Sequence, residues 1–124
     1  KKLAPNGVNL IIDMIGGEIA DDAIKNLSWE GKFIIIGFAG GKIPKIPANR
    51  LLLKSSSAIG LYWGQYAFIN PPLIGESFDK LMKMYEEKKL KPKIGKIFKL
   101  EEASKALEFL LSRSNTGKII LTCN

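Results

Sequence analysis

Three glycine-bearing segments are the parts of this sequence whose residues could do chemistry. They are residues 13–17, 37–41 and 61–64. Each follows an apolar run that we expect to be a strand, and open α/β sheets bind ligands beyond the carboxyl ends of their strands. Glycine lets the backbone approach a ligand closely. Together the segments predict a cofactor cleft, although each one alone is also typical of a simple strand exit.

Two kinds of side chain in these segments could contact a ligand. Asp13 could hydrogen-bond a ribose, or it could anchor the turn that follows it, which is the more ordinary role. Tyr62 and Trp63 could flank a planar ring, although such a pair more often packs in a core or an interface. No two carboxylates stand at a spacing that requires acid–base catalysis.

The composition excludes several classes of site. The chain has 124 residues, no histidine and a single cysteine, Cys123. Zinc sites in proteins need three or four ligands, usually Cys or His, so a zinc site is nearly excluded. A Ser-His-Asp or Cys-His triad needs a histidine. One thiol cannot form a disulfide within the chain, and it favours a reducing compartment.

The charge pattern indicates a lysine-rich surface. The formal net charge is +7, from 19 basic and 12 acidic residues. Such a balance could favour anionic partners, but a solvated surface is the simpler interpretation. The densest stretch, residues 88–96, has no interleaved aromatic residues for stacking on nucleic-acid bases. No apolar run approaches the roughly 20 residues of a membrane-spanning helix.

The first half of the chain predicts strands and helices in alternation. Residues 8–13, 32–37 and 57–61 are short apolar runs, and the first two are expected to be strands buried on both faces. Apolar residues at helical spacing follow Glu18 in a unit that ends at Gly31. Residues 48–54 could form a short helix. This order is the signature of a parallel sheet with right-handed crossovers, an α/β fold.

The second half predicts a helix with an apolar stripe and no partner surface. Pro71 and Pro72 open that helix. Strand, helix and strand are then expected at residues 94–98, 100–113 and 118–122. A parallel sheet needs flanking strands and helices on both faces, and the pattern here is incomplete. We therefore expect this chain to be the carboxyl-terminal part of a longer protein.

An ordered series of segments resembles the zinc-independent medium-chain reductases, the quinone oxidoreductase-like relatives of zeta-crystallin. The series covers essentially the whole chain. It consists of residues 13–17 (DMIGG), 29–41 (WEGKFIIIGFAGG), 46–54 (IPANRLLLK), 59–64 (IGLYWG) and 112–121 (SRSNTGKIIL).

The resemblance implies a fold and a cofactor site. Residues 1–63 correspond to the second half of a doubly wound, NADP-binding Rossmann domain, and residues 64–124 to the segment that returns to a GroES-like catalytic domain. The implied cofactor is NADP(H), without zinc. The residues expected to bind it are Gly16, Gly17, Ile36, Gly37, Phe38, Ala39, Leu61, Tyr62 and Trp63.

The resemblance also implies an activity for the complete protein, hydride transfer from NADPH to a small molecule, a quinone or an activated enone. The chain alone is expected to lack this activity and to bind NADPH weakly or not at all, because the Gly-rich phosphate fingerprint is absent from it. Two alternatives stay open. One is a catalytically incompetent, truncated dimerisation or interaction fragment, and the other is a basic nucleic-acid-binding module.

Partners and location follow from the same resemblance. The complete protein is expected to form a homodimer through an edge strand at residues 57–61, since an uncovered apolar edge pairs readily. A nucleic-acid partner is not favoured, and no membrane association is expected. The location is expected to be intracellular, either cytoplasmic or mitochondrial.

Overall fold

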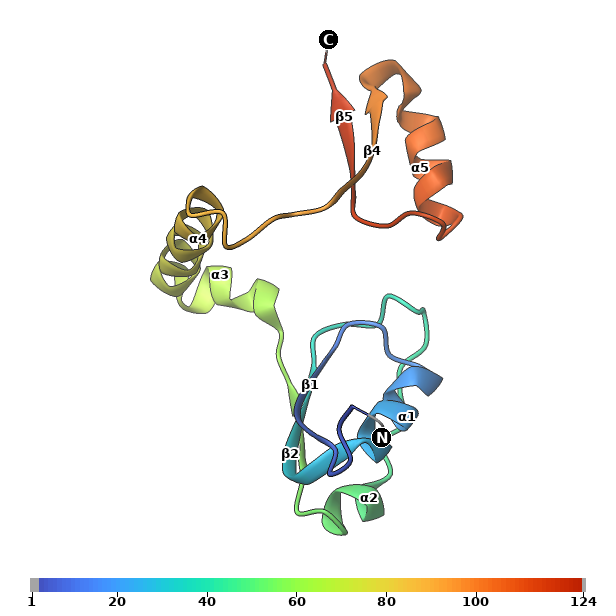
Figure 1. Ribbon diagram of the computed structural model, residues 1–124, viewed down its shortest axis with the longest axis vertical. Helices are drawn as coiled ribbons and strands as arrows, with labels where there is room; N and C mark the ends of the chain where they lie inside the picture. Colours follow the sequence, from blue (N-terminus) through green and yellow to red (C-terminus); the bar gives the residue numbers. More distant parts are fainter. Residues whose placement is uncertain (1–2, 124) are drawn as a thin grey trace. The chain divides into compact units, whose positions relative to one another are not determined.

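The chain forms two compact units, Lys1–Pro71 and Pro72–Asn124. The computed structural model describes residues 3–123 (Figure 1). The family resemblance predicts a boundary between residues 63 and 64. The structure keeps a 3-10 turn, Trp63–Gln65, and the short helix α3, Tyr66–Ile69, within the first unit. The assignment of each part to a domain of a complete reductase stays a prediction.

The first unit is built on a parallel sheet, which confirms the α/β expectation. Its strands are β1 (Val8–Asp13), β2 (Leu27–Ile35) and β3 (Ser57–Gly60), in the order β1-β2-β3. Both pairs are parallel, and Ile34 lies between Ile12 of β1 and Ile59 of β3. All three strands therefore end at the same edge of the sheet.

Helix α1 is shorter than the sequence pattern predicts. It spans Glu18–Lys25, and Leu27 already begins β2. The expected helical unit reached Gly31, but Gly31 lies inside β2. There the pairing with β1 shifts register, and Glu30 takes a φ of 57°. Glycine within a strand often marks such a bulge. The prediction of the helix end was wrong because this glycine permits a bulge instead of ending a helix.

The core of the first unit lies between the sheet and its helices. Ala20 and Ile24 of α1 pack with Leu27 and Phe33 of β2, and all four are almost completely buried. The helix α2 (Ala48–Leu52) adds Leu51 to this cluster. Helices α1 and α2 lie on the same side of the strands (Figure 1).

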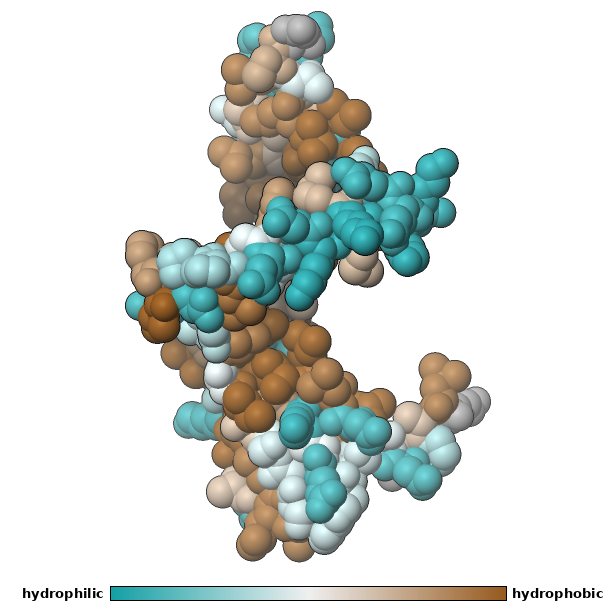
Figure 2. Space-filling view, turned by 90° about the vertical axis from the view of Figure 1, so that its left-hand side faces the viewer, coloured by the Kyte–Doolittle hydropathy of each residue, from teal (hydrophilic) through white to brown (hydrophobic). Residues whose placement is uncertain are grey.

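Nothing in the described part of the first unit, residues 3–71, covers the opposite face of this sheet. Leu10, Ile12 and Ile59 point away from the core and are 54%, 53% and 42% exposed. Figure 2 views the side away from α1 and α2, where apolar residues gather over the strands. The expectation that the strands are buried on both faces is therefore wrong within the first unit, although their continuous apolar sequence is the pattern of doubly covered strands.

The second unit pairs two parallel strands with one packed helix. Strands β4 (Ile94–Lys99) and β5 (Lys118–Thr122) form its sheet. Helix α5 (Ala103–Leu111) follows a 3-10 turn, Leu100–Glu102, and packs on both strands.

The long helix α4, Pro71–Glu86, carries the expected apolar stripe. Phe78 and Tyr85 are more than half exposed, and Leu81 is 49% exposed. Across residues 3–123, no helix is both long and apolar enough to cross a bilayer.

An ion-pair cluster connects α1 to α2 and gives a pH-dependent prediction. Arg50 donates to the carboxylate and the carbonyl of Asp21, and Lys25 Nζ lies 3.2 Å from the same carboxylate. The hydrogen bonds from Arg50 first, and from Lys25 second, hold the pKa of Asp21 below its ordinary value. Because the folded-state pKa is lowered, the stabilisation is complete above the ordinary pKa and is lost as the pH falls through the lowered one.

We expect Asp21→Asn to reduce the free energy of unfolding at neutral pH by a small amount, because the group is exposed. The difference from the parent should shrink toward zero in acid, where Asp21 is protonated in both states. Urea denaturation at a series of pH values measures this. The matched control is Asp79→Asn on the exposed side of α4. A deficit that persists unchanged at the lowest pH would contradict the assignment.

Candidate functional site

The three glycine-bearing segments meet at the carboxyl edge of the first sheet, as their sequence positions predict. Backbone hydrogen bonds join the first segment to the second and to the end of β2, and the third segment to the end of β2. The donors and acceptors are Ile36 N to Asp13 O (2.8 Å), Ala39 N to Met14 O (2.9 Å), Gly40 N to Ile15 O (2.8 Å) and Leu61 N to Ile35 O (2.8 Å).

Asp13 is the buried polar side chain beneath this edge, and its role is to hold a turn. Its carboxylate accepts hydrogen bonds from Ile15 N at 2.9 Å and from Gly16 N at 3.1 Å. The residue is only 6% exposed. A buried carboxylate needs such donors, and these backbone groups supply them. The structure therefore favours the turn-anchor interpretation of Asp13 over a ribose contact.

Gly16 is a glycine that the local packing requires. Its φ is +73°, and a Cβ built on it would lie 2.7 Å from the carbonyl oxygen of Lys42 and 3.0 Å from the Phe38 ring. Any side chain here would collide with backbone. Gly16 thus lets the first segment pack against the second. This packing alone explains why the position is a glycine.

An open hollow of about 520 Å³ lies where β2 and β3 end. Five of the nine predicted cofactor residues line it, together with Ile35 and Gly60. These five are Ile36, Gly37, Phe38, Leu61 and Tyr62.

The other four predicted residues do not line this hollow. Gly16 lies next to the Phe38 ring, and Ala39 N donates a hydrogen bond to Met14 O. Trp63 stacks obliquely on Tyr66, with ring centroids 6.0 Å apart. Gly17 opens instead on a second hollow.

Gly37 and Gly60 give the first hollow its floor, and neither is explained by packing. A Cβ added to Gly60 would meet no atom within 4 Å, and one added to Gly37 would meet only Met14 O, at 3.8 Å. Neither residue has the positive φ that favours glycine. The floor is thus a cradle that a side chain would fill. The lining carries no charged side chain, which suits the neutral ring of a reduced nicotinamide.

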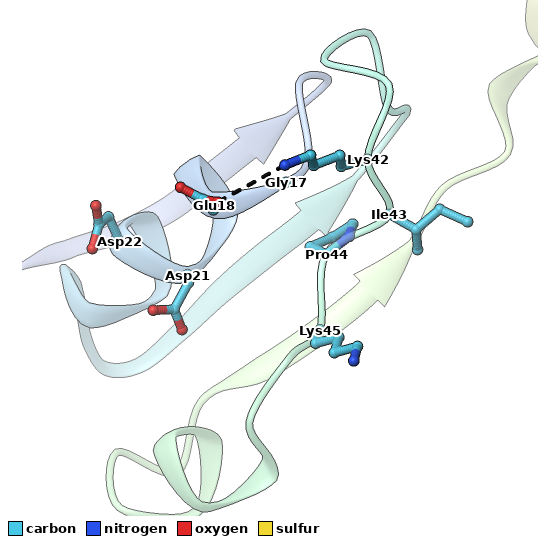
Figure 3. A pocket seen from close by; sticks show the side chains of 8 residues that line it. All are labelled: Gly17, Glu18, Asp21, Asp22, Lys42, Ile43, Pro44 and Lys45. Atoms are coloured by element: carbon cyan, nitrogen blue, oxygen red, sulfur yellow. Dashed lines mark ion pairs between the residues drawn. The ribbon is translucent and has the colours of Figure 1, made fainter.

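A second hollow, of about 720 Å³, lies between the start of α1 and residues 42–45 (Figure 3). Its side chains carry both signs of charge, and Lys42 Nζ reaches Glu18 Oε1 at 4.0 Å. Asp21 and Asp22 also line it, and the negative charge of these carboxylates does not suit a phosphate.

Sequence reasoning missed this second hollow. Pro44 and Pro47 indicated only that the segment is not a helix. The same prolines also signal an extended segment that could pass over α1.

A family model described as zinc-binding dehydrogenase matches residues 1–121. The chain belongs to the zinc-binding dehydrogenase family. This membership confirms the resemblance to medium-chain reductases that the ordered segments indicated.

The curated and solved relatives extend the match. Quinone oxidoreductase-like protein 2 of Bos taurus is 43% identical over 122 residues, which are 98% of this chain and 35% of that protein. A putative NADPH:quinone reductase from Bacillus thuringiensis superposes with a TM-score of 0.77 at 24% identity, covering 96% of this chain and 37% of that one. A mycobacterial protein complexed with NADPH gives 0.78 at 21%, covering 97% and 37%.

The comparisons establish the family and the fold, while most of each relative lies outside the match. The chain spans about a third of the length of the curated relatives that it matches. The solved relatives share a Rossmann-type parallel fold with it, and this agrees with the observed sheet of β1, β2 and β3.

The family description names zinc, but the residues of this chain do not fit that metal. The chain has no histidine and one cysteine. Residues 3–123 hold no group of three or more Cys, Asp or Glu side chains placed to bind a metal ion. Since protein zinc sites need such ligands, no step of the chemistry is assigned to zinc in this chain.

Proposed function

We propose that this chain forms the nicotinamide side of an NADPH-dependent reductase that transfers hydride to a quinone or an activated enone. The observation that carries the proposal is the uncharged hollow at the ends of β2 and β3, floored by Gly37 and Gly60. Ligands in open α/β sheets bind in this position. Cytosol or mitochondrion is the proposed location.

The names of the relatives support the cofactor and the acceptor. One is a quinone oxidoreductase-like protein, one a putative NADPH:quinone reductase, and one was solved with NADPH. A quinone and an activated enone are both conjugated acceptors with an electron-poor carbon. We therefore group them as one substrate class.

The residues of the hollow would position the ring and exclude water. The bound cofactor would supply the hydride. Gly37 and Gly60 would let the ring lie close to the backbone, while Ile36, Phe38 and Leu61 would cover it with apolar surface. A water-poor surface prevents loss of reactive species and strengthens local electrostatic interactions.

We also propose that the complete protein is a homodimer through residues 57–61. β3 is an edge strand of the described sheet, and Ile59 on it is 42% exposed. Edge strands with apolar side chains pair unless they are covered. Analytical ultracentrifugation at micromolar concentration should give a dimer mass, and a monomer under those conditions would refute this part.

The test uses the natural polypeptide that carries this sequence, expressed at its full length. We expect it to oxidise NADPH when phenanthrenequinone or methyl vinyl ketone is added, as measured by NADPH absorbance. Cys123 is an exposed thiol, and thiols add to both probes, so all assays use a Cys123→Ser background. If neither probe causes NADPH oxidation, the proposal is overturned.

Two further results separate the alternatives. A natural polypeptide of only 13.7 kDa would favour the incompetent interaction fragment. Tight binding of nucleic acid with a steep salt dependence would favour the basic module.

A further inference from the structure

Tyr62 is the one residue with a polar side chain in the lining of the hollow at the ends of β2 and β3. The other lining residues are glycine, aliphatic residues and phenylalanine, namely Ile35, Ile36, Gly37, Phe38, Gly60 and Leu61. A tyrosine hydroxyl donates a hydrogen bond through its proton. Within the described lining, Tyr62 is thus the only side chain that can stabilise negative charge on a bound molecule.

The backbone of Tyr62 is held while its hydroxyl is free. Leu61 is tied to β2 by its hydrogen bond to Ile35 O, and Tyr62 O accepts a hydrogen bond from Gln65 N at 3.1 Å. The Tyr62 ring lies over Gly64, where a Cβ would be 3.5 Å from Cε2. The residue is 76% exposed, and its hydroxyl bonds to no group of residues 3–123. The hydroxyl is therefore available to an external acceptor.

We propose that the Tyr62 hydroxyl donates a hydrogen bond to the carbonyl oxygen of the quinone or enone during reduction. This inference rests on the proposed function and assigns a substrate-contacting residue to it. When hydride adds to the electron-poor carbon, which is the β-carbon of an enone or a carbonyl carbon of phenanthrenequinone, an electron pair moves onto the carbonyl oxygen. Tyr62 stabilises that charge and transfers its hydroxyl proton to the oxygen. A proton from water then restores the Tyr62 hydroxyl. The acceptor gains one hydride and one proton in total.

The apolar surroundings make such a bond effective. Hydrogen bonds to developing negative charge contribute most where water and competing charges are absent. The lining of the hollow carries no charged side chain, so no charged group there competes with Tyr62 for the acceptor. The competing explanation is that Tyr62 only packs its ring on Gly64, in which case the hydroxyl is dispensable.

The test compares Tyr62→Phe with Tyr66→Phe in the full-length polypeptide, both in the Cys123→Ser background. Tyr66 packs on Trp63 and is absent from the lining of the hollow, so it is the matched control. With phenanthrenequinone, Tyr62→Phe should lower kcat by about 100-fold, the typical loss for one donor to a developing oxyanion. KM should change little, and Tyr66→Phe should behave like the parent.

A second readout needs no turnover. The infrared carbonyl band of cyclohexenone, bound in the presence of NADP⁺, should lie at lower frequency in the parent than in Tyr62→Phe. An equal kcat and an equal carbonyl band in the two proteins would overturn the inference. If the parent oxidises NADPH and Tyr62→Phe is unimpaired, the role of Tyr62 is refuted and the proposed function stands. A parent that oxidises no NADPH refutes the proposed function, and the role of Tyr62 with it.

Discussion

Replacing Gly60 by valine is expected to lower kcat/KM of the full-length polypeptide for NADPH about 100-fold, while leaving it folded. Displacing a bound reactant by about 1 Å can cost that much. The valine methyls would occupy the cradle where the nicotinamide is proposed to lie. The fold should tolerate the change, because a Cβ on Gly60 meets no atom within 4 Å and valine is favoured in strands.

Two other glycines sharpen this experiment. Gly75 of α4 is also open, with no atom within 4 Å of an added Cβ, so Gly75→Ala should leave NADPH kinetics unchanged. Gly16→Ala should instead destabilise the fold, because its Cβ would lie 2.7 Å from Lys42 O. Steady-state kinetics and thermal unfolding measure the two effects separately. A Gly60→Val protein with parental kcat/KM would show that the cradle does not hold the cofactor.

Phe33→Ala is expected to reduce the free energy of unfolding of this chain by about 3–5 kcal/mol. Phe33 is 0% exposed and packs with Ile24 and Leu27 in the core between α1 and β2. Its removal would leave a cavity that the strand cannot close, because β2 is paired on both sides. Domains are commonly stable by only about 5–15 kcal/mol, so this loss is a large part of the total.

Denaturation followed by circular dichroism measures this effect. Lys32→Ala is the matched control, because Lys32 is the exposed neighbour of Phe33 on the same strand. A surface change of this kind is expected to stay within about 0.5 kcal/mol. A loss of less than about 1 kcal/mol for Phe33→Ala would be well below the cost of a core cavity and would contradict the assigned core.

The strands were the most predictable part of the fold. The run at residues 8–13 is β1 without change, because branched apolar residues bounded by glycine have few alternatives. The end of α1 was not predictable. Leu27 fits the apolar period of the helix, yet it is the first residue of β2. It is almost completely buried there, so its apolar side chain is compatible with either element.

The site was predictable in its position and not in its detail. Strand ends and glycines together located the edge where the three segments meet. The sequence could not distinguish Gly16, which packing requires, from Gly60, which packing does not. That difference depends on neighbours distant in the chain, such as Lys42. The hollow beside α1 was missed for the same reason, because residues 42–45 reach Glu18 only in the folded unit.

Hydrogen exchange of the full-length polypeptide, with and without saturating NADPH, tests the central claim most directly. The account predicts slower exchange on binding at residues 36–38 and 60–62, the two segments that line the hollow, and no change in α5. Bound NADPH that leaves both segments unprotected would contradict the claim that this edge of the sheet holds the nicotinamide.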